Sequence, residues 1–473
     1  MRRMGNRATN ITVLLIVAAL VCLCSTASAA VEEFTYTAGR FGTVHLYRST
    51  PRPRHVVLFI SGDGGWNLGV VDMARALAGL DALVVGVDIT DYLKQLGQSG
   101  EACLYPAADF ESLSKYVQKR LGLDHYIQPI LVGYSSGATL VYALICQAPD
   151  NTFKAAISMG FCPDLTLPRP PCKGNGLIWQ KRPDKGDYVF KPADHLPTPW
   201  IAFQGEIDQV CDAGRARDFA ASVPNAQVVT LLKVGHGFSV PANWFPQFKR
   251  TFAHLAAPSD TPASAGISDL PLVEVPARAS GSHQLVVMIS GDGGWAGIDR
   301  ELSKGLAERG LPVVGIDSLA YFWTARTPEG ASKDLARILR HYLPAWHKEQ
   351  AILIGYSLGA DVLPFMTSRL PADLQTSLGL IVLLGPGHET AFEFHVTDWF
   401  GLGGRVKQFP LLPEMSRLPP SPTLCIYGER ESDTLCRETL PPSVQKIGMG
   451  GGHHFGRDVK AITEAIIRAI AKQ

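Results

Sequence analysis

Apolar residues gather along the chain in short runs, separated by longer stretches of mixed polarity. In the first half, an alternating lead-in at 34–50 predicts a hairpin, and six runs then have the length of buried strands: 55–60, 83–87, 129–132, 155–159, 200–203 and 228–234. Helix-length segments separate them, among others at 68–79, 111–121 and 137–147. Strands that alternate with helices predict an α/β domain, in which a mostly parallel sheet is covered by helices on both faces.

The second half repeats this pattern. Its apolar runs lie at 284–289, 311–316, 351–354, 378–384, 423–427 and 444–447, and an amphipathic helix is expected at 457–471. A stretch rich in Pro, Ser and Ala at 256–266 predicts a linker between the halves. We therefore predict an N-terminal domain at 30–256, a linker at 257–268 and a C-terminal domain at 269–473.

Each half also contains a long insertion, at 162–198 and at 385–422. Loops of this length are typically functional lids or disordered segments. The second insertion contains Phe392, Phe394, Trp399 and Phe400, and these aromatic residues favour a lid.

Four short motifs occur once in each half and in the same order. Ile-Ser-Gly-Asp-Gly-Gly-Trp occupies 60–66 and 289–295, and Gly-Tyr-Ser-x-Gly occupies 133–137 and 355–359. Asp-x-x-Cys occupies 208–211 and 433–436, and Gly-His occupies 235–236 and 452–453. The offsets between the copies drift only from about 217 to 229 residues, which indicates a duplicated domain rather than a short-period repeat.

The Gly-x-Ser-x-Gly motif follows an apolar run and precedes a helix-forming segment in both copies. In α/β-hydrolases this context forms the nucleophile elbow, a strained turn that presents the serine at the edge of the sheet. The flanking glycines remove Cβ atoms that would collide with the neighbouring strand and helix. We predict Ser357 as the nucleophile of the C-terminal domain and Ser135 as its N-terminal counterpart.

The general base of such a site follows the last strand of the sheet. Alignment on the phenylalanine of Gly-His-Gly-Phe predicts His236 in the first copy and His453 in the second, with the adjacent His454 as the alternative. These serines, acids and histidines follow the chain order of α/β-hydrolases.

The acid follows the preceding strand, and Asp208 takes this place in the first copy. Both Glu431 and Asp433 qualify in the second copy. Counting forward from the preceding glycine favours Glu431, whereas counting back from the cysteine favours Asp433. We prefer Asp433.

The Ser-Gly-Asp-Gly-Gly-Trp loop follows an early strand, where α/β-hydrolases place one donor of the oxyanion hole. Asp292 and Gly293 are the candidates in this loop, and the N–H group after the nucleophile, at Leu358, is the second donor. Asp292 is otherwise a turn or N-cap residue, or it receives a substrate ammonium. Asp361, just after the elbow, is also a candidate to receive the ammonium, or it is a residue on the first turns of the helix that is stabilised by the helix dipole. Trp295 and Trp399 are the other candidate substrate contacts.

Composition restricts the function classes. The chain has 473 residues, 46% of them hydrophobic, and its net charge of +1 gives no field that would favour nucleic acid. The start combines positive charges, an apolar stretch at 11–24 and Ala27-Ser28-Ala29, which predicts a Sec-type signal peptide at 1–29, with an uncleaved anchor as the alternative. No spacing typical of metal ligands or of a dinucleotide site is present, so we predict neither metal nor cofactor.

Nine cysteines include two in the signal region, so the seven that remain cannot all pair within the chain. Exported proteins usually pair their cysteines. Cys425 with Cys436 is the first expected pair, and Cys162 with Cys172 is the second.

The doubled Ser-Gly-Asp-Gly-Gly-Trp loop, Gly-Tyr-Ser-Leu-Gly-Ala-Asp at 355–361 and Gly-Gly-His-His-Phe at 451–455 together resemble the bacterial AcvB/VirJ virulence protein family. The resemblance covers essentially the whole mature chain, and the two-domain length is that of AcvB-like members. It implies a periplasmic hydrolase of lysyl-phosphatidylglycerol, with Ser357, His453 and Asp433 as its triad. It also implies a link to virulence, lipid homeostasis and type IV secretion. The first half departs from the signature at Ser136 and Thr139.

The sequence is compatible with more than one substrate and more than one function. An aminoacylated phospholipid at the inner-membrane surface is the expected partner, and lysyl and alanyl headgroups are not distinguished. A generic carboxylesterase is an alternative within the enzymes. The alternative outside them is a periplasmic adaptor that keeps the fold in order to bind a secretion-system component.

Overall fold

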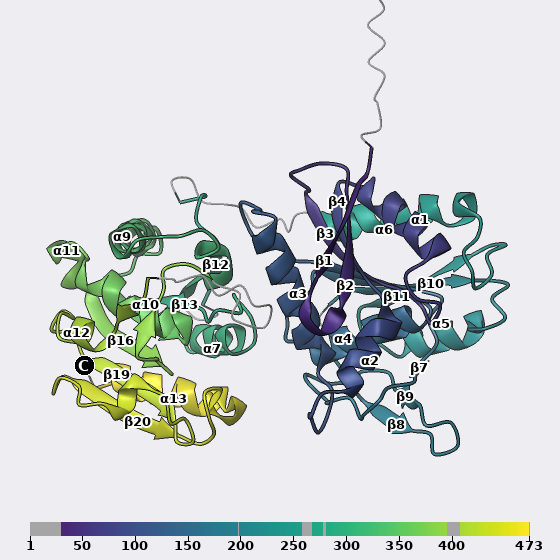
Figure 1. Ribbon diagram of the computed structural model, residues 1–473. Coiled ribbons are helices and arrows are strands. Elements are labelled where there is room, and N and C mark those ends of the chain that lie inside the picture. The colour runs from purple at the N-terminus through teal and green to yellow at the C-terminus, as the bar shows by residue number, and fades with distance from the viewer. Residues whose placement is uncertain (1–29, 197, 258–266, 278–280, 395–406, 473) are drawn as a thin grey trace, which may run out of the picture.

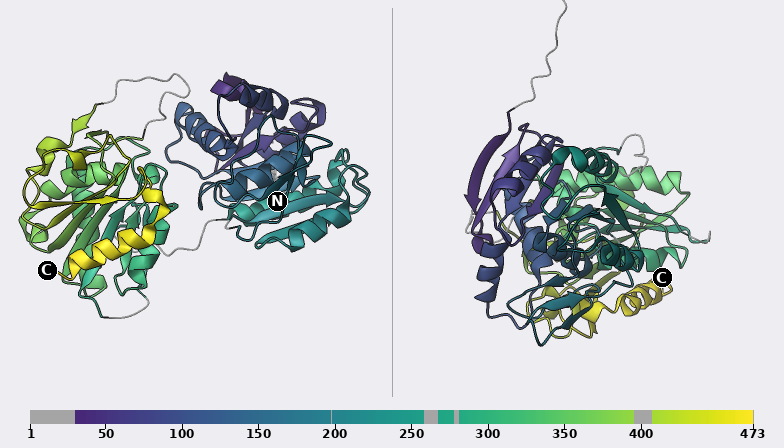
Figure 2. Two further views of the ribbon diagram at one scale, coloured as in Figure 1. Left: turned by 90° about the horizontal axis from the view of Figure 1, so that it is seen from below. Right: turned by 90° about the vertical axis from the view of Figure 1, so that its right-hand side faces the viewer.

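The computed structural model describes residues 30–196, 198–257, 267–277, 281–394 and 407–472. They form two α/β domains, coloured purple to teal and green to yellow in Figure 1. Figure 2 shows the domains side by side. The predicted signal peptide lies outside the described residues, as does most of the predicted linker.

The N-terminal domain is built on an eight-stranded sheet in the order β1-β2-β4-β3-β5-β6-β10-β11. The strand β2 pairs antiparallel with β1 and β4, and all other neighbours are parallel, as expected from the alternation of strands and helices. The strands are β1 Glu32–Thr37, β2 Thr43–Arg48, β3 His55–Ile60, β4 Ala82–Val87, β5 Ile130–Tyr134, β6 Ala155–Met159, β10 Trp200–Gly205 and β11 Ala226–Leu231.

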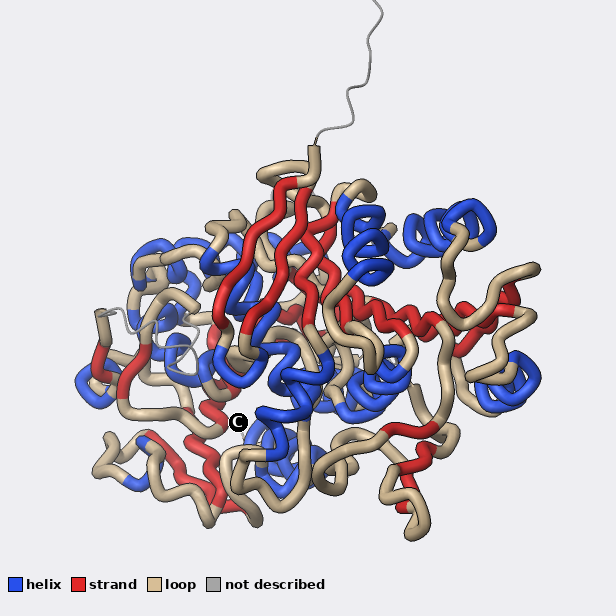
Figure 3. Tube along the Cα trace, turned by 45° about the vertical axis from the view of Figure 1, so that its right-hand side comes forward, coloured by secondary structure: helices blue, strands red, loops and turns tan. Residues whose placement is uncertain are grey.

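Helices cover both faces of this sheet, and each face has its own apolar core. One face packs against α1 Leu68–Ala78 and α6 Phe245–Ala256. The other packs against α2 Ile89–Gly97, α3 Pro106–Arg120, α4 Ser136–Gln147 and α5 Ala213–Ala221. Two short 3-10 helices, η1 Gly39–Phe41 and η2 Pro241–Asn243, complete this domain. In Figure 3 the helices (blue) flank the strands (red).

The C-terminal domain repeats the plan with seven strands in the order β12-β14-β13-β15-β16-β19-β20. Only the edge strand β12 runs antiparallel to its neighbour. The strands are β12 Leu272–Val275, β13 Gln284–Ile289, β14 Val313–Ile316, β15 Gln350–Tyr356, β16 Leu378–Leu384, β19 Thr423–Gly428 and β20 Val444–Met449.

In this domain, α7 Ile298–Ala307 and α13 Val459–Ile470 cover one face of the sheet. The other face packs against α9 Pro328–Ala345 and α10 Leu358–Ser368. The remaining short elements are α8 Ser318–Tyr321, α11 Ala372–Gln375, α12 Leu412–Met415, η4 Leu435–Arg437 and η5 Phe455–Arg457. The prediction of two tandem α/β domains is confirmed.

The two long insertions contain small sheets of their own. The first forms β7 Asp164–Leu165, β8 Trp179–Lys181 and β9 Tyr188–Phe190, and the second forms β17 Glu389–Thr390 and β18 Phe409–Pro410. Phe392 and Phe394 of the second insertion are buried in apolar clusters, so they do not form an exposed aromatic surface. Trp399 and Phe400 lie outside the described residues.

The domains meet where Asn151 donates to the carbonyl of Trp295 at 2.9 Å and Arg300 pairs with Asp150 at 3.4 Å, and also at the C-terminal end of α3. Trp323 is buried there and donates from its indole Nε1 to the carbonyl of Leu123 at 2.7 Å. Lys119 contacts Glu393 at 2.9 Å, and Phe394 stacks on Trp323. Because Lys119 and Leu123 belong to the N-terminal domain and their partners to the C-terminal one, these contacts join the two folds.

The described residues contain three disulfide bonds: Cys103–Cys172, Cys162–Cys211 and Cys425–Cys436. The prediction for Cys425 with Cys436 is confirmed, and the prediction for Cys162 with Cys172 is wrong. Each of those two cysteines instead bonds to a residue distant in sequence that the fold brings beside the first insertion. Of the cysteines in the described ranges, Cys146 is the one outside a disulfide bond, and it is buried. Disulfide bonds are typical of proteins in an oxidising compartment.

Among the described residues, no helix combines the length and the apolar character that a membrane crossing requires.

Candidate active site

Both predicted serines stand at strained turns between a strand and a helix. Ser357 joins β15 to α10 with φ 51°, and Ser135 joins β5 to α4 with φ 55°. Non-glycine residues rarely adopt a positive φ, and such strain persists where the surrounding structure holds it in place. A Cβ atom on Gly359 would lie 2.1 Å from the carbonyl oxygen of Ile289, so the glycines of the motif are required by close backbone approach. The predicted elbow geometry is confirmed in both domains.

In the C-terminal domain, a serine, a histidine and a carboxylate form a hydrogen-bonded chain. Ser357 Oγ lies 3.0 Å from His453 Nε2, and His453 Nδ1 lies 2.5 Å from Glu431 Oε1. The serine follows β15, the acid follows β19 and the histidine follows β20. The carboxyl ends of these parallel strands bring the three side chains to one edge of the sheet. This is the order and geometry of a Ser-His-acid triad.

Asp433 does not take part in this chain, so the prediction of Asp433 as the acid is wrong. Its side chain is 92% exposed and pairs instead with His388 at 3.2 Å. Counting back from the cysteine gives the wrong acid, because the acid and the cysteine are five residues apart in the second copy and three apart in the first. The alternative acid, Glu431, has only 9% of its side chain exposed.

His454 is likewise excluded as the partner of the serine. Its Nδ1 lies 2.7 Å from the hydroxyl of Tyr356, the residue before the nucleophile. His453 is therefore confirmed as the histidine beside Ser357. Tyr356 had not been singled out, although a tyrosine stands at this position in both copies of the motif.

The N-terminal domain forms a second complete chain. Ser135 Oγ lies 2.9 Å from His236 Nε2, and His236 Nδ1 lies 2.9 Å from Asp208 Oδ2. The other carboxylate oxygen of Asp208 accepts the backbone N–H groups of Val210 and Cys211, each at 2.8 Å. All three predicted residues are brought together, and the acid is fully buried.

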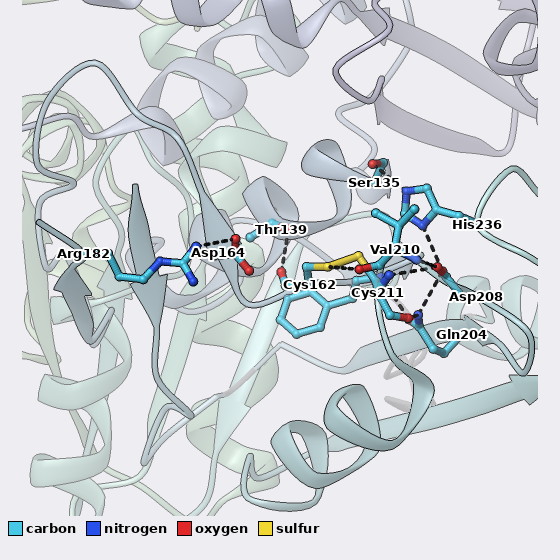
Figure 4. The surroundings of a disulfide bond; sticks show 11 residues. Ser135, Thr139, Cys162, Asp164, Arg182, Gln204, Asp208, Val210, Cys211 and His236 are labelled. Atoms are coloured by element: carbon cyan, nitrogen blue, oxygen red, sulfur yellow. Dashed lines mark hydrogen bonds and ion pairs between the residues drawn. A yellow bond between two sulfur atoms is a disulfide. The ribbon is translucent and has the colours of Figure 1, made fainter. Parts of the chain in front are cut away.

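A disulfide bond supports the acid loop of this second site. Figure 4 shows Cys162–Cys211 beside Asp208, with His236 and Ser135 next to it. The bond ties the loop after β10 to the segment after β6. In the C-terminal domain, Cys425–Cys436 instead ties the acid loop back to its own strand β19. The two acid loops are thus held by different covalent links.

The predicted oxyanion loop passes directly over each serine. A Cβ atom on Gly291 would lie 3.5 Å from that of Ser357, and one on Gly62 would lie 2.9 Å from that of Ser135. Asp292 and Gly293 follow Gly291 on the exposed side of this loop. Leu358 is the first residue of α10, and no hydrogen bond within the described residues uses its N–H group. Both backbone segments expected to supply donors therefore border the nucleophile.

Trp295 does not line the site, so its prediction as a substrate contact is wrong. The side chain is 5% exposed and packs into the sheet core. A Cβ atom on Gly315 of β14 would lie 2.3 Å from the indole ring. Trp295 thus anchors the end of the oxyanion loop. The other aromatic candidate, Trp399, lies outside the described residues.

Acidic side chains gather near Ser357. Burial raises the pKa of Asp361 to about 7, and the charges of Asp292 and Glu431 add to this effect. The N–H group of Gly387 donates to Asp361 at 2.7 Å and opposes the shift. Asp361 is therefore placed where negative charge accumulates, which is compatible with the binding of a cation.

A further carboxyl group had been missed by the sequence comparison. Asp299 is buried on the first turn of α7, and burial raises its pKa well above the ordinary value. The aligned residue of the first copy is Val70, which is also buried. Because the counterpart Val70 is apolar, the comparison of the two copies does not indicate that Asp299 has a functional carboxyl group. Within the described residues, no group of three His, Cys, Asp or Glu side chains could hold a metal ion.

A family model described as bacterial virulence protein (VirJ) matches residues 54–161 and 283–473. The chain belongs to the VirJ family. In the C-terminal domain the VirJ match includes Ser357, Glu431 and His453. In the N-terminal domain it includes Ser135 but ends before Asp208 and His236.

The chain is also similar to solved structures of single α/β domains. It is 19% identical to an esterase from Pyrobaculum calidifontis, over 48% of this chain and 84% of that one, with a TM-score of 0.34. It is 18% identical to an α/β serine hydrolase without lid from Xanthomonas campestris (49% and 97%, TM-score 0.32). It is 16% identical to the esterase domain of a Rhodothermus marinus protein (48% and 98%, TM-score 0.31). No curated protein matches the chain.

Proposed function

We propose that the protein is a periplasmic serine hydrolase that cleaves the aminoacyl ester of lysyl-phosphatidylglycerol at Ser357. The observation that carries this proposal is the hydrogen-bonded chain from Ser357 through His453 to Glu431. An adaptor that only binds a partner has no need for a strained serine aligned with a histidine and a buried acid.

The reaction follows from the geometry. Ser357 Oγ attacks the ester carbonyl while His453 Nε2 takes its proton, and Glu431 holds the imidazole and stabilises the imidazolium. The N–H group of Leu358 and one from the loop at 290–295 receive the developing oxyanion. His453 then returns the proton to the leaving glycerol oxygen. Phosphatidylglycerol leaves in this step, and water then hydrolyses the lysyl-enzyme by the same proton transfers and releases lysine.

The charge around the site supports a cationic aminoacyl group. Asp361 and Asp292 add negative charge beside the triad. A lysyl ester has an α-ammonium and a side-chain ammonium, whereas an alanyl ester has only the first. The side chain of His453 is 38% exposed, and that of His236 is 17% exposed. The histidine of the C-terminal triad is thus the more exposed of the two, which supports a substrate whose headgroup stays attached to a membrane.

The periplasmic location rests on the predicted signal peptide together with the three disulfide bonds. There the enzyme would meet the outer leaflet of the inner membrane as a peripheral protein. Removal of lysine would restore the anionic lipid, which links the activity to lipid homeostasis and virulence.

The test measures lysine release from vesicles that contain lysyl-phosphatidylglycerol. Ser357→Ala is expected to lower the release by at least 10³-fold, because a triad without its nucleophile keeps only a small residual rate. Ser135→Ala is the matched control and is expected to retain the release. Undiminished release by Ser357→Ala would overturn the proposal.

A second arm tests the headgroup. Asp361→Asn is expected to lower kcat/KM for lysyl-phosphatidylglycerol about tenfold more than for the alanyl lipid at pH 8, where the carboxyl is ionised. Equal losses for both lipids would remove Asp361 from the recognition of lysine. Failure of a fluorophosphonate probe to label Ser357 in the folded protein would instead favour the adaptor for a secretion system.

A further inference from the structure

Large apolar side chains are exposed at few places in the described residues, and most of these places lie on segments that follow strands of the N-terminal domain. Of the seven such side chains, five lie at the start of α1 or on the segments that follow β10 and β11, and we call these five the apolar rim: Leu68, Ile207, Val210, Leu232 and Val240. Single exposed apolar residues are common on proteins, but a cluster at one site indicates binding.

The rim follows the elements that build the second triad. Leu68 comes two residues after the loop that covers Ser135, and it is 85% exposed. Ile207 and Val210 lie on the loop that carries Asp208, and the N–H group of Val210 donates to the carboxylate of Asp208. Leu232 and Val240 stand four residues before and after His236. Every loop that supplies a catalytic group thus also supplies an exposed aliphatic side chain, except the elbow itself.

Within the described part of the C-terminal domain, the positions that correspond to the rim carry no exposed large apolar side chain. Alignment on the shared motifs places Gly297 opposite Leu68, Arg430 opposite Ile207 and Arg457 opposite Val240. The residue before the loop cysteine, Leu435, is fully buried, whereas its counterpart Val210 is 67% exposed. The counterpart of Leu232 is Met449, which is apolar and partly buried. The two copies therefore keep the same triad architecture but differ in the character or the burial of the other four side chains.

We propose that Ser135 is the nucleophile of a second esterase site, which takes esters of aliphatic acyl groups. This inference does not depend on the proposed function of Ser357. It rests on the complete hydrogen-bonded chain of Ser135, His236 and Asp208, and on the apolar rim around it.

The step is an acyl transfer that needs no co-reactant other than water. Ser135 Oγ forms a bond to the carbonyl carbon, and its proton moves to His236 Nε2. The carbon–oxygen bond to the alcohol breaks, and His236 gives the proton to that alkoxide. Water then adds to the acyl-enzyme, with its proton passing through His236, and the fatty acid leaves as Ser135 regains its proton.

The rim determines the expected selectivity. Each methylene group that leaves water on binding contributes a factor of about four to the affinity. An acyl chain of eight carbons that contacts only part of the rim is therefore expected to react with a kcat/KM at least tenfold above that of acetate.

The experiment uses the full-length Ser357→Ala protein, so that only the N-terminal triad remains. p-Nitrophenyl acetate and octanoate are the probes. We expect octanoate hydrolysis with the stated preference and a loss of at least 10³-fold on adding Ser135→Ala. Turnover that survives in the double variant, or an absence of preference for octanoate, would overturn the proposal. Lysine release is measured separately and reports on Ser357 alone.

Substitutions in the apolar rim distinguish a substrate-binding site from a surface that only contacts membranes. Leu68→Gly and Val240→Arg, which copy the second domain, are expected to lower the octanoate preference about tenfold. Leu412→Ser removes an exposed apolar side chain far from this rim in sequence and is the control, with an unchanged preference. If the rim variants weaken sedimentation with lipid vesicles and leave the octanoate preference intact, the rim is a membrane contact and the substrate assignment is wrong.

Discussion

Glu431 and Asp433 stand two residues apart on one loop, yet only Glu431 reaches His453. The carboxylate of Glu431 accepts from the imidazole at 2.5 Å and also from the N–H group of Gly428 at 3.3 Å. Asp433 points to solvent, where it contacts His388. At the scale of single residues, the path of the loop decides which of the two carboxylates reaches the histidine. The spacing of the motifs does not predict this path.

The first prediction compares these two acids. Glu431→Gln keeps the size of the side chain but removes the charge that stabilises the imidazolium. It is expected to lower kcat for ester hydrolysis at Ser357 by about 10³- to 10⁴-fold. Asp433→Asn, on the same loop, is expected to change kcat by less than about twofold. Steady-state kinetics of both variants in a Ser135→Ala background check this, and the reverse order would restore Asp433 as the acid.

The second prediction concerns the stability of the fold against pH. Burial raises the pKa of Asp361 from 3.8 to about 7, so the folded protein holds this proton at a pH at which the unfolded chain has released it. Between about pH 4 and pH 7 the contribution of Asp361 to the free energy of unfolding therefore falls as pH rises, by at most about 1.4 kcal/mol per pH unit.

Urea denaturation at pH 5 and pH 7.5 measures this contribution. Relative to the wild type, Asp361→Asn is expected to lose part of the pH dependence, because its side chain stays neutral throughout. Identical pH slopes for the two proteins would contradict the assigned shift.

At the scale of elements, each oxyanion loop is fixed by a tryptophan that packs on a glycine in the neighbouring strand. Trp295 covers Gly315 in the C-terminal sheet, and Trp66 covers Gly86 in the N-terminal one. In both cases the indole occupies the space where a Cβ atom would stand. The repeated tryptophan is thus explained by the placement of a loop and not by contact with a substrate.

The third prediction tests this packing. In Gly315→Ala the new methyl group would lie 2.3 Å from the Trp295 ring, so the ring and the loop must move. Overpacking of this kind typically destabilises by about 1–3 kcal/mol. We expect a lower Tm together with a reduced kcat at Ser357. Gly281→Ala, where no atom lies within 4 Å, is the control and is expected to change neither quantity.

At the scale of the whole molecule, the sequence predicts the architecture better than the details of the site. The apolar runs locate the central strands of both sheets, because parallel strands buried on two faces have a strong signal. The nucleophile elbows and the triad histidines could be predicted because they lie in glycine-containing motifs, whose glycines allow close backbone contacts. The disulfides of Cys162 and Cys172 could not be paired from sequence, since their partners are 49 and 69 residues away and meet them only in the folded chain.

The contact between the domains gave no sequence signal either. Trp323, Leu319 and Phe394 form a small buried cluster against Tyr126 of the other domain. No periodicity distinguishes these residues from those of an ordinary core. The domains are nevertheless joined there by an indole hydrogen bond and an ion pair in addition to apolar packing.

The last prediction concerns this junction. Trp323→Ala removes the stacked ring and the hydrogen bond to Leu123, and replacement of a buried tryptophan costs about 3–5 kcal/mol. Since the lost contacts join the domains, we expect calorimetric unfolding to separate into two transitions and the linker at 257–268 to be cleaved faster by proteases. Trp346→Ala, which loses a contact to Tyr342 within one domain, is the matched control. It is expected to lower one transition without uncoupling the domains, and a single unchanged transition in Trp323→Ala would show that the junction does not couple their stability.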